Sequence, residues 1–204
     1  MIYDVSMLIH EDMQVYKNKE EKKPVFVNAS NHDNSSAYET ILKFNLHTGT
    51  HVDYPLHMIK DGKTSDAEVL EKLMGTCKVL DMTACHDAIS KSDLIKHEIK
   101  ENDFLLFKTQ NSYSENFIFD FIYLDREGAK YLSDIKVRGV GIDGLGIERN
   151  QKDHMTHKYL LEDDIVIIEG LRLANVEAKN YHMTCLPLRI KGVEASPARV
   201  ILED

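Results

Sequence analysis

The chain has 204 residues, of which 43% are hydrophobic and 29% are charged, and its formal net charge is −9. A chain of this length can bury a core as one domain. Its acidic balance argues against nucleic acid or an anionic membrane surface as a partner, because both require a basic surface. No run approaches the ~18 apolar residues of a membrane span, and the N-terminus lacks the basic start and apolar stretch of a signal peptide. The cysteines are odd in number and widely spaced, without a C-x-x-C pair, so we expect a reduced, cytoplasmic setting.

Strand-like and helix-like segments alternate along the chain. A helix is expected from residue 65, where acids precede the apolar side chains of Val69, Leu70 and Leu73, and others over residues 93–99 and 125–132. No linker, internal repeat or low-complexity tract interrupts this pattern, which predicts one mixed α/β domain spanning residues 1–204. The expected strands cover residues 3–8, 38–45, 78–82, 104–108, 137–143, 165–169, 186–191 and 199–202.

Three histidines and one aspartate crowd into residues 47–57, and imidazole and carboxylate are ligands of zinc and similar ions. Gly49, Pro55 and the β-branched residues between them disfavour a helix. In an extended chain all three histidines and Asp53 have the same parity and point to one side. His47 and His51 would then lie roughly 13 Å apart at about 3.3 Å per residue, too far for one ion. We therefore expect a metal site with a bend in the chain at Gly49.

A second set of candidate ligands lies in the C-terminal half. Glu169 ends the apolar run 165–168, which is typical of a buried strand. Its carboxylate is therefore either a solvated strand end or a charge held by a metal ion. His157 precedes this run in a segment with helical character, and His154, one turn earlier, is the competing candidate.

The first motif resembles a known signature. It reads His-x-Gly-Thr-His-x-Asp-x-Pro-x-His, as in the metal-dependent cyclase-like hydrolases, a family that includes bacterial kynurenine formamidase and isatin hydrolase. The resemblance covers most of the chain: it continues through residues 157–169 and includes residues 186–190 and 196–199, which are similar to the family's C-terminal hairpin. It implies a single-domain swivelling β/β/α fold with a mixed sheet.

The resemblance also implies how the candidate ligands share their metal ions. A first ion would be held by His47, His51 and Asp53. A second would be held by Asp53, His157 and Glu169, so that both carboxylates could bridge the pair. Zinc, with two ions per chain, is the default for such ligands, and manganese is compatible with the oxygen-rich half.

Two further residues concern the reaction and its substrate. By the resemblance, His57 shuttles a proton between the attacking water and the leaving amine, the alternative being that it only orients a ligand. Kynurenine formamidases carry a tryptophan in the N-terminal loop, but this chain has none, and Tyr16 is the nearest equivalent as a substrate-contacting residue. Lys17 and Lys19 make this loop basic, which favours an anionic substrate.

The leading hypothesis is a metal-dependent amidohydrolase that converts an aryl formamide such as N-formylkynurenine to kynurenine and formate, a step of tryptophan catabolism. The alternatives are ring opening of a cyclic amide such as isatin, and a metal-binding relative without catalysis. The expected partners are a small amide substrate and further copies of the chain, as a homodimer or homotetramer. The related enzymes assemble in this way, and the loop over residues 10–24 has little apolar content to order it alone.

Overall fold

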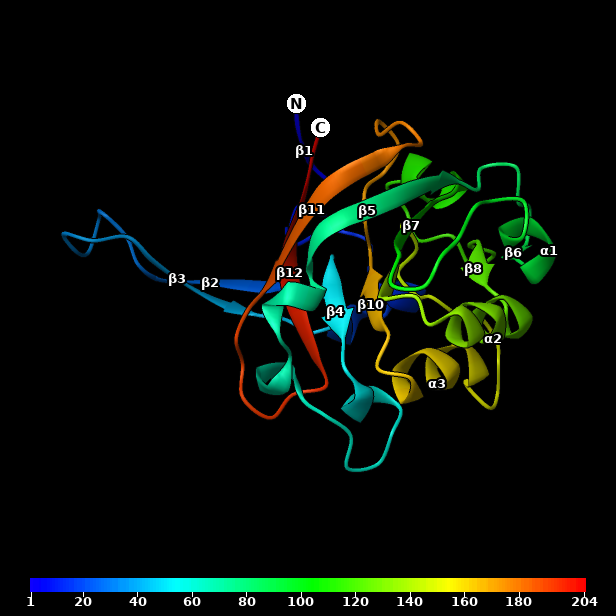
Figure 1. The fold of residues 1–204 in the computed structure, drawn as a ribbon. Helices are drawn as coiled ribbons and strands as arrows, with labels where there is room; N and C mark the ends of the chain where they lie inside the picture. Colours follow the sequence, from blue (N-terminus) through cyan, green and yellow to red (C-terminus); the bar gives the residue numbers. More distant parts are fainter.

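Eight strands form one sheet, and seven of them close into a barrel in a computed structural model that describes residues 1–204 (Figure 1). The twelve strands of the protein are β1 (Ile2–Asp4), β2 (Val25–Ser30), β3 (Glu39–Lys43), β4 (His51–Asp53), β5 (Met74–Asp81), β6 (Ala88–Ile89), β7 (Phe104–Lys108), β8 (Tyr123–Leu124), β9 (Gly139–Ile142), β10 (Val166–Glu169), β11 (Asn180–Pro187) and β12 (Ala195–Glu203). The order around the barrel is β12-β11-β5-β7-β9-β10-β4, and β4 returns to pair with β12. The run β5-β7-β9-β10 is parallel and the other pairings are antiparallel, which confirms the expected mixed sheet.

The side chains of the barrel strands alternate between two apolar cores, one inside the barrel and one between the barrel and the helices. Along β7, Phe104 and Leu106 belong to the inner core, whereas Leu105 and Phe107 belong to the outer one. The inner core is so tight that a Cβ on Gly139 of the neighbouring strand would lie 2.2 Å from the Phe104 ring. Burial on both faces explains why the parallel strands have near-continuous apolar sequences.

Three α-helices cover the outer core: α1 (Lys91–Leu94), α2 (Arg126–Ile135) and α3 (Met155–Glu162) (Figure 1). The predicted helix over residues 125–132 is confirmed as α2, with Asp125 capping its first turn. The prediction over residues 93–99 is wrong in extent, because α1 ends at Leu94 and the next residue, Ile95, is 58% exposed. The helix around His157 is confirmed as α3. None of the helices combines the length and the apolar character that spanning a bilayer requires.

The helix predicted from residue 65 is wrong. The segment forms two single 3₁₀ turns, Ser65–Ala67 and Leu70–Lys72, separated by extended backbone. Tertiary hydrogen bonds override the local helical pattern here: the Ser65 amide donates to the Val193 carbonyl at 3.0 Å, and Asp66 accepts from the Gly192 amide at 2.8 Å. The loop before β12 thus holds this segment in a non-helical shape.

Most expected strands are present, with shifted ends. Those over residues 38–45, 78–82, 104–108, 137–143, 165–169 and 199–202 are confirmed as β3, β5, β7, β9, β10 and β12, and the first is reduced to β1. The strand expected over residues 186–191 is wrong in position, because β11 ends at Pro187. Its signal was the alternation of Tyr181, Met183 and Cys185, which point into the inner core.

The hairpin of β2 and β3 projects away from the barrel (Figure 1). These strands pair only with each other, and every side chain of β3 is exposed. Apolar residues face solvent on both sides of this arm, with Val27 opposite Ile41 and Phe26 opposite Leu42.

Candidate metal centre

The strands β4 and β10 bring three of the predicted ligands onto one surface. They pair antiparallel, with His51 directly opposite Glu169 and Asp53 opposite Ile167. Because side chains alternate along a strand, His51, Asp53 and Glu169 face outward beneath α3, while Val52 between the first two enters the inner core. Directly opposed residues have their Cβ atoms about 5 Å apart, close enough for two ligands of one ion.

The predicted bend at Gly49 is confirmed and brings His47 to the same surface. Gly49 has φ +74°, and a Cβ at this position would lie 2.6 Å from Ile9. The turn places His47 Nδ1 only 3.3 Å from His51 Nε2. On the other side of its ring, His47 Nε2 lies 3.5 Å from a carboxylate oxygen of Glu194, a contact that orients the imidazole.

Three donor atoms form a nearly equilateral triangle. The distance from Asp53 Oδ1 is 3.0 Å to His47 Nδ1 and 3.4 Å to His51 Nε2, and the two nitrogens are 3.3 Å apart. Ligands of a tetrahedral zinc ion at about 2.0–2.1 Å lie about 3.3 Å from one another. The triangle therefore has the size of one face of a zinc coordination shell.

Two further carboxylate oxygens, one from Asp53 and one from Glu169, face a third histidine. His157 Nε2 lies 3.6 Å from Asp53 Oδ2 and 3.4 Å from Glu169 Oε1. The other oxygen of Glu169, Oε2, lies 3.4 Å from His51 Nε2. Each carboxylate thus presents one oxygen to each half of the cluster, an arrangement suited to bridging two ions.

Glu148 is a buried site residue that the sequence analysis missed. One of its oxygens lies 3.1 Å from His157 Nδ1 and accepts the His157 backbone N–H at 3.2 Å. A carboxylate behind a ligating histidine fixes the ring and raises its basicity. The available signal was its position in the loop after the parallel strand β9, because such loops gather at one edge of the sheet.

His154, the competing candidate, also contacts Glu148, through its Nδ1 atom. Its side chain is 51% exposed, whereas that of His157 is 7% exposed. Of these two histidines, only His157 has a nitrogen within ion-pair distance of Asp53 and Glu169. The geometry therefore favours His157 as the ligand and leaves His154 at the mouth of the site.

The cluster holds buried negative charge that bound cations would neutralise. Both oxygens of Asp53 are buried and accept no hydrogen bond, and Glu169 is buried beside them. Burial alone would lower the pKa of His51, but the Asp53 and Glu169 carboxylates raise it to about 10. His51 Nδ1–H donates to the Gly49 carbonyl at 2.9 Å, which turns Nε2 toward the carboxylates. Buried carboxylates and converging imidazole lone pairs fit divalent metal ions.

His57 lies beside the cluster, on a 3₁₀ turn over Pro55–His57. Its ring centroid is 4.3 Å from that of His47 and 5.4 Å from that of His157. Burial lowers the pKa of His57, so the imidazole is neutral near pH 7 and able to accept a proton. His47, Asp53 and His57 also offer one ligand atom each within 4.8 Å of one another, so the position of His57 is compatible with metal ligation as well.

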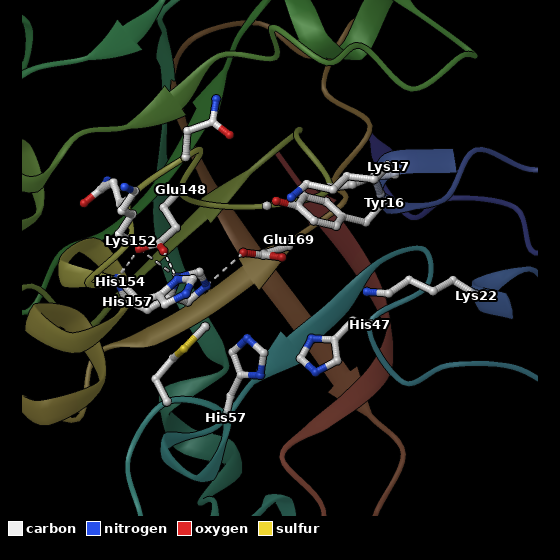
Figure 2. Close-up of a pocket in the computed structure, with 15 residues that line it drawn as sticks. Tyr16, Lys17, Lys22, His47, His57, Glu148, Lys152, His154, His157 and Glu169 are labelled. Atoms are coloured by element: carbon white, nitrogen blue, oxygen red, sulfur yellow. Dashed lines mark hydrogen bonds and ion pairs between the residues drawn. The ribbon is translucent and has the colours of Figure 1, made fainter. Parts of the chain in front are cut away.

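A cavity of about 570 Å³ opens directly onto these residues (Figure 2). His47, His57, His157 and Glu169 line its floor, and Tyr16 lines its wall. The Tyr16 ring packs edge-to-face on Phe117, with centroids 5.5 Å apart. The residue expected to contact the substrate thus lies at the cavity.

The chain resembles known proteins over nearly its whole length. Residues 3–149 match a family model described as "Putative cyclase". The chain is 29% identical over 206 residues to a kynurenine formamidase of Salinibacter ruber, covering 100% of this chain and 97% of that protein. It is 30% identical to cyclase-like protein 3 of Oryza sativa subsp. japonica, covering 98% of this chain and 79% of that protein.

Solved structures show the same architecture, which confirms the expected fold. One described as a predicted metal-dependent hydrolase from Bacillus stearothermophilus is 46% identical with a TM-score of 0.91, covering 99% of this chain and 97% of that one. Isatin hydrolase A from Labrenzia aggregata has a TM-score of 0.86 over 99% of this chain and 93% of that one. At 20% identity, the latter likeness concerns the fold alone.

Proposed function

Because this chain belongs to the cyclase family, we propose that it is a metal-dependent hydrolase of an amide C–N bond. The observation that carries the proposal is the arrangement of Asp53 and Glu169, each of which faces histidines with both of its oxygens. The proposed ligands are His47, His51, Asp53, His157 and Glu169. The proposed metal is zinc, at two ions per chain, with manganese as the alternative.

The chemistry follows from the groups around the cavity. Divalent ions held there would lower the pKa of water and polarise a carbonyl oxygen. His57, neutral and next to His47, takes the proton of the attacking water and returns it to the departing amine nitrogen. Glu148 keeps the His157 ring in the orientation that ligation requires.

The proposed substrate is an aryl formamide such as N-formylkynurenine, which would be converted to kynurenine and formate. Two features support this choice: the kynurenine formamidase relative, and a Tyr16 ring that offers an apolar face at the cavity wall. The second candidate is a cyclic amide such as isatin, which the likeness in fold to isatin hydrolase favours.

A turnover screen tests this function. The zinc-loaded and manganese-loaded protein should be assayed against N-formylkynurenine, isatin and simple cyclic amides, with metal-free protein as the control. We expect hydrolysis of the formamide only in the loaded samples. A loaded protein that binds metal and hydrolyses none of these amides would support the non-catalytic alternative.

We also propose that the chain assembles as a homodimer or homotetramer through the β2–β3 arm. A two-stranded hairpin alone is marginally stable in water. The arm exposes Val25, Val27 and Ile41 on one face, and a second copy of the chain would remove these side chains from solvent.

A further inference from the structure

Three lysines line the cavity above the metal centre: Lys17, Lys22 and Lys152 (Figure 2). None of them lies within 4.0 Å of a carboxylate oxygen, although the chain is acidic overall. Elsewhere lysines such as Lys72 and Lys78 have carboxylate partners at 2.5 and 2.6 Å. Ammonium groups without a carboxylate partner are therefore available at this cavity to an anionic group of a ligand.

Lys22 is the best placed of the three. Its carbonyl accepts a hydrogen bond from Thr48 Oγ1 at 2.8 Å, which ties this segment to the residue next to His47. The side chain is partly buried, and its Nζ lies 5.3 Å from the centroid of the Tyr16 ring. Lys17 Nζ lies 5.2 Å from the same ring. Both ammonium groups therefore lie over the Tyr16 ring within cation–π distance and are held together at one wall of the cavity.

Most of the other lining residues carry polar or charged groups. Only Tyr16, Met58 and Leu145 are hydrophobic residues, and Asn150 and Gln151 add two carboxamides. The carboxylates at the floor, Glu148 and Glu169, already face histidines. A ligand that fills this cavity therefore meets ammonium and amide groups beyond its reactive bond, and a purely apolar amide would leave them without partners.

We propose that Lys22, with Lys17 beside it at the Tyr16 ring, binds a carboxylate group of the substrate, so that the substrate is an acid-bearing amide. The inference rests on the proposed hydrolase function, because it assigns the second anchor point of the same substrate. A lysine suits this role as a compact point charge. An acid-bearing formamide is thereby favoured over a neutral ring amide such as isatin.

Two probes that differ by one carboxylate test the proposal: N-formylanthranilate and formanilide. In Lys22→Met, kcat/KM for N-formylanthranilate should fall about tenfold, mostly through KM, the size expected for one partly exposed ion pair. The value for formanilide should stay within about twofold. Lys191→Met, which removes an exposed lysine outside the cavity, should change neither. Equal losses for both probes, or none for the anion, would overturn the proposal.

Binding provides a readout that needs no turnover. Calorimetry on the zinc-loaded protein should show benzoate binding about tenfold more weakly to Lys22→Met than to wild type, at unchanged zinc content, with benzamide unaffected. Unchanged benzoate affinity would mean that the anion binds the metal ions instead, and the proposal would be wrong. If wild type hydrolyses neither probe yet benzoate binding depends on Lys22, the anion site stands and the hydrolase function fails.

Discussion

The face of β4 and β10 beneath α3 and the arm of β2 and β3 differ in how completely their side chains are partnered. On the first, His51 and Asp53 are 0% and 2% exposed, and each faces charged groups from other elements. On the second, Val25 and Ile41 are 52% and 50% exposed, and no strand or helix packs on them. Substitutions on the metal face should therefore act through a network, whereas substitutions on the arm should act only through another copy of the chain.

The largest effect is expected from Asp53→Ala. Both oxygens of this carboxylate face histidines, so its removal should abolish binding of both ions and leave no measurable hydrolysis. Elemental analysis of protein purified without chelator gives the metal content. Ile41→Ala on the arm is the matched control and should keep both metal and activity. Wild-type metal content in Asp53→Ala would show that the cluster does not depend on this residue.

His57→Ala should separate proton transfer from ligation. We expect the metal content to remain and the rate to fall roughly 10²–10⁴-fold, the usual contribution of a positioned general base. The measurement combines elemental analysis with steady-state kinetics on the same sample. If the variant loses metal as Asp53→Ala does, His57 is a ligand and its role as a base is wrong.

Glu148→Gln should weaken metal binding without removing a ligand. Loss of the charge behind His157 is expected to raise the dissociation constant of the second ion roughly 10–100-fold, measured by competition with a chelating dye. His154 contacts the same carboxylate from the exposed side, so His154→Ala should change this dissociation constant much less. If His154→Ala weakened metal binding more than His157→Ala, His154 and not His157 would be the ligand.

The metal-free protein should lose stability as the pH rises. The pKa of His51 is raised to about 10 by Asp53 and Glu169, above its unfolded value of 6.5. The interaction of protonated His51 with the two carboxylates therefore stabilises the fold fully below about pH 6.5. This contribution is lost as the pH rises through about 10. Thermal unfolding in excess chelator should show a falling Tm between pH 7 and 10. Zinc-loaded protein should not follow this trend, because deprotonation favours ligation.

The smallest effect on catalysis is expected from the arm. Ile41→Asp places a charge on the face that also carries Val27, and it should convert the dimer or tetramer to a monomer in light scattering at micromolar concentration. Activity per chain should change by less than about twofold, because Ile41 does not line the cavity. Thr40→Asp, on the opposite face of β3, is the control. A monomeric wild type would contradict the proposed assembly.

The sequence alone determined the parts of the site whose geometry is local. The spacing in residues 47–57 requires a bend, and Gly49 adopts it with a positive φ. The apolar run before Glu169 predicted the strand β10, which presents this carboxylate opposite His51. Alternation along a strand and the conformational freedom of glycine are properties of a few consecutive residues, so they can be read without knowledge of the rest of the chain.

Only the tertiary structure decided which distant groups complete the site. Glu148, Glu194 and Lys22 belong to no ligand motif, because each acquires its role from a histidine or a cavity formed by other segments. The helix expected from residue 65 failed for the same reason: the loop before β12 offers hydrogen bonds that local propensity cannot anticipate. A side chain's charge is encoded in the sequence, but its partners depend on which strands the closed barrel brings side by side.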